Sequence, residues 1–226
     1  MDAKVGDWVV TPRIGKPVEV QALWLNALWI AAQWAPRFVA PLARGRAAFA
    51  ARFWNEARGC LYDVVDADHR AGACDATLRP NQILAVGGLP LLLVDGARPP
   101  GGRRGRAGAA DAARPAFASP RGAGILRPLR GDGPSRDGRY HQGTVWPWLL
   151  GPFVEAWVRT HGDDAAARDE AARASSPAPR PPRRGRPRPR VGDRRRRCAP
   201  HPARLSFQAW SLGELLRLDR EVLAAP

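Results

Sequence analysis

Apolar residues gather in five stretches of the chain, and their spacing predicts helices rather than strands. The first stretch, residues 17–35, is apolar on nearly every face, as expected of a helix buried among other helices. Pro17 suits an early helical position, and Pro36 ends the run. We therefore predict a helix between these two prolines.

Four further stretches show helical spacing or lead into an apolar helix. They are residues 45–58, with Phe49, Phe53 and Trp54 before Gly59; residues 78–94, a loop entering an apolar helix; residues 144–158, with Thr144 as N-cap; and a helix from Phe207 onward. The short β-branched runs "WVVT" and "LYDVVD" are isolated, so no parallel sheet is expected. The pattern favours an all-α fold built from antiparallel helix pairs.

The net charge of +15 is unevenly distributed along the 226 residues. Residues 97–139 contain ten Arg and three Asp, and residues 176–206 contain eleven Arg and one Asp, so the rest of the chain is close to neutral. The lysines are Lys4 and Lys16, and Phe117 is the one aromatic residue of the two basic stretches. Nucleic-acid-binding arms commonly mix Lys with Arg and interleave aromatic side chains. The pattern therefore favours GC-rich coding sequence over a nucleic-acid-binding surface.

The cysteines and the lack of long apolar runs together predict the cellular compartment of the protein. Cys60, Cys74 and Cys198 lie in unrelated contexts, and no Cys/His spacing matches a zinc site, so we expect free thiols and no metal. No stretch of 18 or more uncharged apolar residues predicts a membrane span. The segment "MDAKVGDW" lacks the apolar core of a signal peptide. We expect a cytoplasmic protein without a cofactor.

Five polar and aromatic clusters interrupt the predicted helices. They are "MDAKVGDWVVTPRIGKPVEV", "GCLYDVVD", "RPNQ", "RDGRYHQGTVWPWLLGPF" and "QAWSLGELLR". Each joins carboxylates, amides or Arg to Trp or Tyr, a combination typical of carbohydrate sites. Trp covers the apolar face of a sugar ring, while Asp, Asn, Gln and Arg bond to its hydroxyls. Trp and Leu at helical spacing are more often core residues, so one cluster alone would not identify such a site.

Together and in this order, the clusters resemble the C-terminal catalytic region of glycogen debranching enzymes, the amylo-α-1,6-glucosidase family. The resemblance covers about residues 1–96, 133–160 and 207–220, through "GKPVEVQALWLNAL", "RPNQ", "YHQGTVWPWLLGPF" and "QAWS". It implies that residues 1–226 form the C-terminal part of one (α/α)6 toroid of the six-hairpin glycosidase type. It also implies hydrolysis of the α-1,6-linked glucose at a trimmed branch, with glycogen or another branched α-glucan as partner.

The resemblance also assigns a proton donor. Glycosidases generally place two carboxyl groups beside the scissile bond, ~6.5–9.5 Å apart in inverting enzymes. The family's general acid is the Asp of a Trp-Met-Asp motif, which matches Asp2. Met1 would then be an internal methionine of a longer protein. The alternative is that Asp2 is a frayed terminal residue without a catalytic role.

Further residues become candidates for the sugar pocket through the same resemblance. Glu19 could instead be a structural partner of Arg13, Asp63 could cap a loop, and His141 could cap the following helix. The candidates are Glu19, Asn26, Asp63, Arg79, Asn81, His141, Gln142 and Trp146.

The family's general base has no counterpart in this chain. It is the Glu of a segment like "GHVSEIADGDAPHTPRGC" just before "QAWS", where this chain has the Arg-rich residues 186–204. Read one nucleotide later, codons for residues 186–206 can encode "GLGHVSEIADGDAPHTPRGCP", leading into the unshifted "FQAWS". We infer a one-nucleotide frame slip, restored near Ser206. Residues 97–132 and 173–206 are expected to be disordered or frame-disrupted, since Pro and Gly at high density prevent a regular helix.

The missing base predicts little or no hydrolase activity. Loss of water activation typically lowers the rate ~10²–10⁴-fold, and Glu214, beyond "QAWS", is a poor substitute. Two other classes stay open at this point. One is a non-catalytic glycan-binding remnant, and the other is a basic nucleic-acid-binding protein that uses Arg184–Arg197 as an arm.

The frame slip can be checked in the DNA. We expect the codons GTC GGA GAT for Val191, Gly192 and Asp193, because only these encode Ser-Glu-Ile when read one nucleotide later. Sequencing of the gene gives the answer directly. Any other codon choice at these three positions removes the hidden Glu and overturns the slip.

Overall fold

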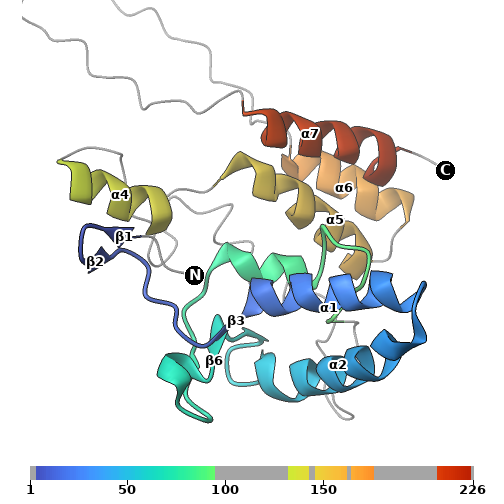
Figure 1. Ribbon diagram of the computed structural model, residues 1–226. Helices are drawn as coiled ribbons and strands as arrows, with labels where there is room; N and C mark the ends of the chain where they lie inside the picture. Colours follow the sequence, from blue (N-terminus) through green and yellow to red (C-terminus); the bar gives the residue numbers. More distant parts are fainter. Residues whose placement is uncertain (1–3, 95–131, 143–145, 162–163, 176–207, 225–226) are drawn as a thin grey trace, which may run out of the picture.

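A computed structural model describes residues 4–94, 132–142, 146–161, 164–175 and 208–224 (Figure 1). The described residues are mostly helical, with a few two-residue strands, which agrees with the predicted helical class. The α-helices are α1 (Val18–Ala32), α2 (Val39–Phe53), α4 (Gly133–Gln142), α5 (Leu150–His161), α6 (Ala165–Ser175) and α7 (Ala209–Arg217).

Short helical turns complete the helical part. They are the 3₁₀ turns η1 (Pro36–Phe38), η2 (Ala67–His69), η3 (Pro80–Ala85) and η4 (Pro147–Leu149), and the π turn η5 (Leu218–Val222). Helix α1 packs on α2 and η3, while α5 packs on α6 and α7 (Figure 1). The structure therefore contains helix pairs, as the sequence predicts; their closure into a toroid stays a prediction.

Helix α1 closely matches its predicted bounds. It starts after Pro17, whose backbone is extended, and ends before Pro36. Its inner face, which includes Val18, Ala22, Leu25 and Leu28, is buried against α2 and neighbouring elements. Phe49 and Phe53 of α2 stack at 4.5 Å between ring centroids in the same core. Burial of each large apolar side chain contributes roughly 1.5–3 kcal/mol, so this face holds the first helix pair together.

The β-branched runs form strands that the all-α prediction did not include. Strands β1 (Lys4–Val5) and β2 (Trp8–Val9) make one antiparallel pair, and β4 (Trp54–Asn55) and β5 (Cys60–Leu61) make another. A third ladder has the order β3 (Lys16–Pro17), β6 (Val64–Val65) and β7 (Cys74–Asp75). Val64 and Val65 are both 1 % exposed. Pairing satisfies their backbone N–H and C=O groups, which would otherwise be costly to bury.

The helices differ from the prediction at α2, whose bounds are shifted, and at α4 and α6, which were not expected. Helix α2 begins at Val39, well before the predicted 45, and ends at Phe53, where Trp54 turns into β4. Helices α4 and α6 were not predicted from periodicity; α6 includes residues 173–175, which the sequence had assigned to a disordered or frame-disrupted segment. Asp132 is the last residue of the other segment predicted to be disordered or frame-disrupted, residues 97–132. Its side chain accepts a hydrogen bond from the N–H of Ser135 at 3.0 Å, as an N-cap does.

The prediction of an apolar helix within residues 78–94 is wrong. Only the turn η3 forms, and the chain then passes Gly87 and Gly88 in close contact with α5. A Cβ on Gly87 would lie 2.4 Å from the carbonyl oxygen of Pro152 and 2.6 Å from the backbone nitrogen of Ala156. Gly88 has a φ of +76°, a conformation that favours glycine. The glycines end the helical turn and let this loop reach the backbone of α5.

Gly87→Ala tests this backbone contact. The added methyl group meets main-chain atoms that cannot move aside, so we expect a loss of roughly 1–3 kcal/mol in the free energy of unfolding, measured by urea titration. Gly213→Ala in α7 is the control, because nothing lies within 4 Å of its Cβ position. Equal stability of both variants would show that α5 does not constrain Gly87.

Candidate functional site

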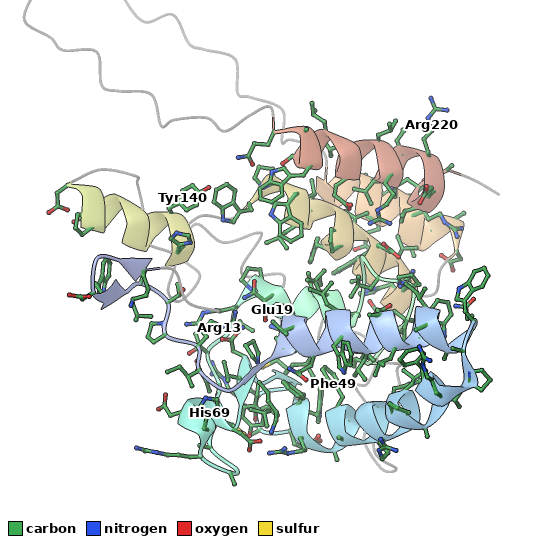
Figure 2. All side chains as sticks on the ribbon, in the orientation of Figure 1. Arg13, Glu19, Phe49, His69, Tyr140 and Arg220 are labelled. Carbon is green, nitrogen blue, oxygen red and sulfur yellow. The ribbon has the colours of Figure 1, made fainter. Side chains whose placement is uncertain are left out.

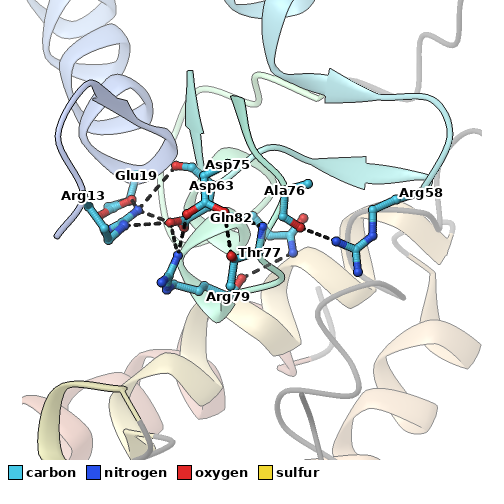
Figure 3. Close-up of polar contacts among 9 residues, drawn as sticks. All are labelled: Arg13, Glu19, Arg58, Asp63, Asp75, Ala76, Thr77, Arg79 and Gln82. Atoms are coloured by element: carbon cyan, nitrogen blue, oxygen red, sulfur yellow. Dashed lines mark hydrogen bonds and ion pairs between the residues drawn. The ribbon is translucent and has the colours of Figure 1, made fainter. Parts of the chain in front are cut away.

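Buried charged side chains meet where the N-terminal loop crosses the start of α1 (Figure 3). Arg13 comes from the loop between β2 and β3, and Glu19 from the first turn of α1. Asp63 lies between β5 and β6, and Arg79 directly precedes η3. Arg13, Glu19 and Asp63 are 7 %, 9 % and 2 % exposed, so their charges are largely removed from water.

The Arg13 guanidinium holds both carboxylates. Its Nη1 and Nη2 donate to the two oxygens of Glu19 at 2.5 and 2.7 Å. Its Nε and Nη2 donate to Oδ2 and Oδ1 of Asp63 at 2.7 and 2.9 Å. Arg79 also donates to Asp63, and to Asp75 of β7 at 3.2 Å. Each of the carboxylates of Glu19 and Asp63 therefore receives a two-point contact from Arg13, the strongest geometry available to an Arg–carboxylate pair.

Burial and charge act in opposite directions on these groups. Burial raises the pKa of Asp63 above its ordinary value, and the positive charges of Arg13 and Arg79 oppose this shift without cancelling it. Burial lowers the pKa of Arg13, but hydrogen bonds and charges from Glu19 and Asp63 raise it above its ordinary value overall. Removal of one partner would leave a buried charge without compensation.

The predicted sugar ligands Glu19 and Asp63 thus lie in a network that already occupies their carboxylate oxygens. The Arg13–Glu19 pair is the structural alternative that the sequence left open for Glu19. Asp63 also joins elements through its main chain, since its carbonyl accepts from Val18 N at 2.9 Å and its N–H donates to the carbonyl of Asp75 at 2.8 Å. Arg79 remains partly exposed, with 24 % of its side chain accessible.

Asn26 and the "RPNQ" segment also make structural contacts. The Asn26 side chain donates to the carbonyls of Ala22 and Leu91 at 3.1 and 3.2 Å and accepts from Leu91 N at 2.7 Å. It therefore fixes the loop after η3 to α1. Gln82 accepts from Leu61 N at 3.1 Å, and Asn81 lies half-buried beside it in η3.

A second cluster, the aromatic cluster, joins α4, η4 and α7. It consists of Tyr140, His141, Trp146, Trp148 and Trp210. Tyr140 contacts Trp146 edge to face at 4.6 Å between ring centroids, and Trp146 contacts Trp210 at 6.2 Å. Trp148 lies 5.7 Å from Trp210. The motifs "YHQGTVWPW" and "QAWS", far apart in sequence, are therefore neighbours in space.

Several rings of this cluster are open to solvent. Tyr140, labelled in Figure 2, is 38 % exposed and Trp210 is 54 % exposed. The indole N–H of Trp210 donates to the side chain of Gln208 at 2.6 Å, which fixes the ring. Fixed, exposed aromatic faces with polar neighbours are the surface that a sugar ring requires.

The N-terminal hairpin lies beside the aromatic cluster. A Cβ on Gly138 of α4 would sit 3.3 Å from the ring of Trp8 in β2, so the hairpin and α4 are in contact. Figure 1 shows β1 and β2 directly next to α4. Asp2, the predicted general acid, lies outside the described residues, as does the side chain of Gln142.

A network at the junction of α5 and α7 was missed by sequence reasoning. Glu155 is 6 % exposed; it accepts from Arg217 at 2.6 Å and from Gly88 N at 3.1 Å, and it pairs with Arg159. Arg217 also holds Glu214 at 3.0 Å. No motif indicated these pairs, because they depend on how α7 packs on α5.

The sequence did not single out Tyr140, Trp148 and Trp210 as candidates, although they stand inside quoted motifs. Of the predicted residues, the structure brings Glu19, Asp63 and Arg79 together in the buried network, and His141 and Trp146 in the aromatic cluster. In the described part of the chain, no group of three or more His, Cys, Asp or Glu side chains could hold a metal ion, and no helix could cross a membrane.

Comparison with known proteins gives one match. A family described as "Amylo-alpha-1,6-glucosidase" matches residues 1–97 and 125–217, most of the chain. The matched ranges include the buried network and the aromatic cluster. No curated protein and no solved structure matches the chain.

Arg13→Lys tests the buried network. Lysine keeps the positive charge but cannot contact two carboxylates at two points each, so we expect a loss of about 3 kcal/mol in the free energy of unfolding. Arg52→Lys is the matched control: it alters an ion pair to Asp66 in which the Arg side chain is 41 % exposed to water, so it should cost clearly less stability. Similar losses in the two variants would contradict a structural role specific to Arg13.

Proposed function

The chain belongs to the amylo-alpha-1,6-glucosidase family, and from this we propose that it recognises a branched α-glucan as a debranching-type glycosidase does. The family match over most of the chain carries the proposal. We further propose that its helix pairs are part of an (α/α)6 toroid and that glycogen or a similar glucan is the ligand.

The aromatic cluster supports glucan recognition. Tyr140 and Trp210 expose ring faces at the meeting point of two motifs that the sequence associates with sugar binding. Burial of an aromatic face against a glucose ring removes apolar surface from water on both partners. His141, exposed beside Tyr140, offers a ring nitrogen to a sugar hydroxyl. Together these groups combine stacking with hydrogen bonding.

We assign proton donation to Asp2. A general acid protonates the glycosidic oxygen as the bond to the leaving sugar breaks, while a second carboxylate removes a proton from the attacking water. The family match supports this assignment, because it begins at residue 1 and so includes Asp2. A donor alone does not activate water.

The carboxylates on α5 and α7 do not fill the role of the base. Glu214 is paired with Arg217, which also binds Glu155, and Glu155 bonds to Gly88 N besides. Both carboxylates are thus already engaged by protein groups and are not free to hold an attacking water. We therefore propose that this chain binds the glucan and releases little or no glucose.

Titration with a maltooligosaccharide tests recognition. We expect binding by the parent chain and a loss of at least about tenfold in affinity for Trp210→Ala, equal to about 1.4 kcal/mol, because a sugar ring on the indole face removes apolar surface from water at about 25 cal/mol per Å². Trp34→Ala is the control, an exposed tryptophan outside the aromatic cluster. Isothermal titration calorimetry measures both.

Incubation with an α-1,6-branched limit dextrin tests turnover in the same preparation. We expect no glucose above the level given by Asp2→Asn. Glucose release that Asp2→Asn abolishes would overturn the proposed inactivity while supporting the donor. Absence of binding, or equal weakening by Trp34→Ala and Trp210→Ala, would contradict the assignment of the aromatic cluster to glucan recognition.

A further inference from the structure

Helix α7 carries Trp210 of the aromatic cluster, yet in the part of the chain that the structure describes it buries none of its own large apolar side chains. Of its nine residues, Ser211 is the buried one. Its three leucines, each 48 % exposed or more, are Leu212, Leu215 and Leu216. Apolar burial within α7 therefore contributes little to its position, although Leu218 of η5, which follows, lies in the core.

The buried carboxylate of Glu155 on α5 supplies a polar contact that holds α7. Arg217, the last residue of α7, donates its Nη1 to Glu155 at 2.6 Å and its Nη2 to Glu214 at 3.0 Å. Glu214 in turn lies against the first turn of α5, where a Cβ on Gly151 would be 2.8 Å from its carboxyl carbon. The Arg217 guanidinium therefore bridges one carboxylate from each helix. Because Glu155 is buried, this charge-assisted contact is stronger than it would be in water.

Glu155 is itself held from other sides. It accepts from Gly88 N at 3.1 Å, and Arg159, one turn along α5, pairs with it as well. The loop that contains Gly88 is bound to α1 through the side chain of Asn26. The carboxylate that receives Arg217 is thus tied to α5 and, through this loop, to α1, so it offers α7 a fixed anchor.

Trp210 lies on the side of α7 that carries these charges. Trp210, Glu214 and Arg217 are spaced by four and three residues, so they follow one another along one face of the helix. The ring of Trp210 reaches Trp146 and Trp148 at 6.2 and 5.7 Å between ring centroids. A roll of α7 on α5 would therefore move the indole of Trp210 relative to both rings.

We propose that the Glu155–Arg217 pair positions Trp210 and thereby sets the affinity of the aromatic cluster for glucan. Arg217 is a positioning residue: it acts through the ring of Trp210 and not by contact with the sugar. The effect on affinity rests on the proposed function, whereas the coupling between Arg217 and the ring of Trp210 stands without it.

Circular dichroism of the full chain without glucan tests the coupling. The indoles of Trp148 and Trp210 are 5.7 Å apart, so their ultraviolet transitions interact and give a band that depends on the angle between the rings. The variant Trp210→Phe identifies this band. We expect Arg217→Met to lose most of it. Arg220→Met is the matched control and should retain the band, because the Arg220 side chain, in η5, is 76 % exposed.

Glu155→Gln decides the coupling if Arg217→Met does not fold. The amide keeps the size and one acceptor oxygen of the carboxylate, and Arg217 retains Glu214, so the fold should be kept while the charge that attracts Arg217 to α5 is removed. We expect the same band to weaken. Urea titration shows which variants are folded. An unchanged band in folded Arg217→Met, or in Glu155→Gln where Arg217→Met is unfolded, would overturn the positioning role.

Titration with a maltooligosaccharide tests the consequence for affinity. We expect Arg217→Met to weaken binding by up to about tenfold, the loss expected for Trp210→Ala. Because Arg217 acts through Trp210, the double variant should bind no more weakly than Trp210→Ala alone. Unchanged affinity of Arg217→Met, or a loss that adds to that of Trp210→Ala, would contradict the proposal. Absence of binding by the parent chain would overturn the proposed function and the effect on affinity, while the dichroism band still decides whether Arg217 positions Trp210.

Discussion

The two-point contacts of Arg13 with Glu19 and Asp63 are the constraint on which the N-terminal half depends. They connect the loop after the first hairpin, the start of α1 and the short ladder around β6 in one buried place. Loss of any partner would leave a buried charge without compensation, which is costly. The network therefore fixes where the N-terminal chain enters the fold.

The quoted motifs fall into two groups: residues that make structural contacts, as in the buried network, and residues of the aromatic cluster, which we assign to sugar recognition. Glu19, Asn26, Asp63 and Arg79 have their polar groups engaged by the protein itself. In "YHQGTVWPW" and "QAWS", Tyr140 and Trp210 expose their rings to solvent instead, while Trp146 and Trp148 are partly buried. We infer that the first set holds the shape of the sugar site and that the second set contacts the sugar. On the frame-slip hypothesis water activation is lost, while α6 and α7, on either side of that segment, both pack on α5.

The apolar run between Pro17 and Pro36 was sufficient to predict α1, which spans Val18–Ala32. The apolar residues after "RPNQ" led to the wrong prediction of a helix, because Gly87 and Gly88 lie in close contact with α5, which no local pattern reveals. Helix α6 is rich in Ala and charged residues and shows little apolar spacing, so only its packing on α5 identifies it. The sequence already offers Arg13 as a structural partner of Glu19. The Glu155–Arg217 pair could not be predicted in this way, because it joins segments whose contact depends on tertiary packing. Local sequence signals therefore predict individual helices, whereas the long-range residue pairs can be identified only from the three-dimensional structure.

We propose that glucan recognition persists where the water-activating carboxylate is missing. Saturation-transfer NMR on one sample with an α-1,6-branched maltooligosaccharide measures both parts together. The account predicts transfer to the glucose ring protons near the branch, with anomeric signals of the α-1,6 linkage unchanged over hours. Loss of those anomeric signals with growth of free glucose, or absence of any transfer, would contradict it.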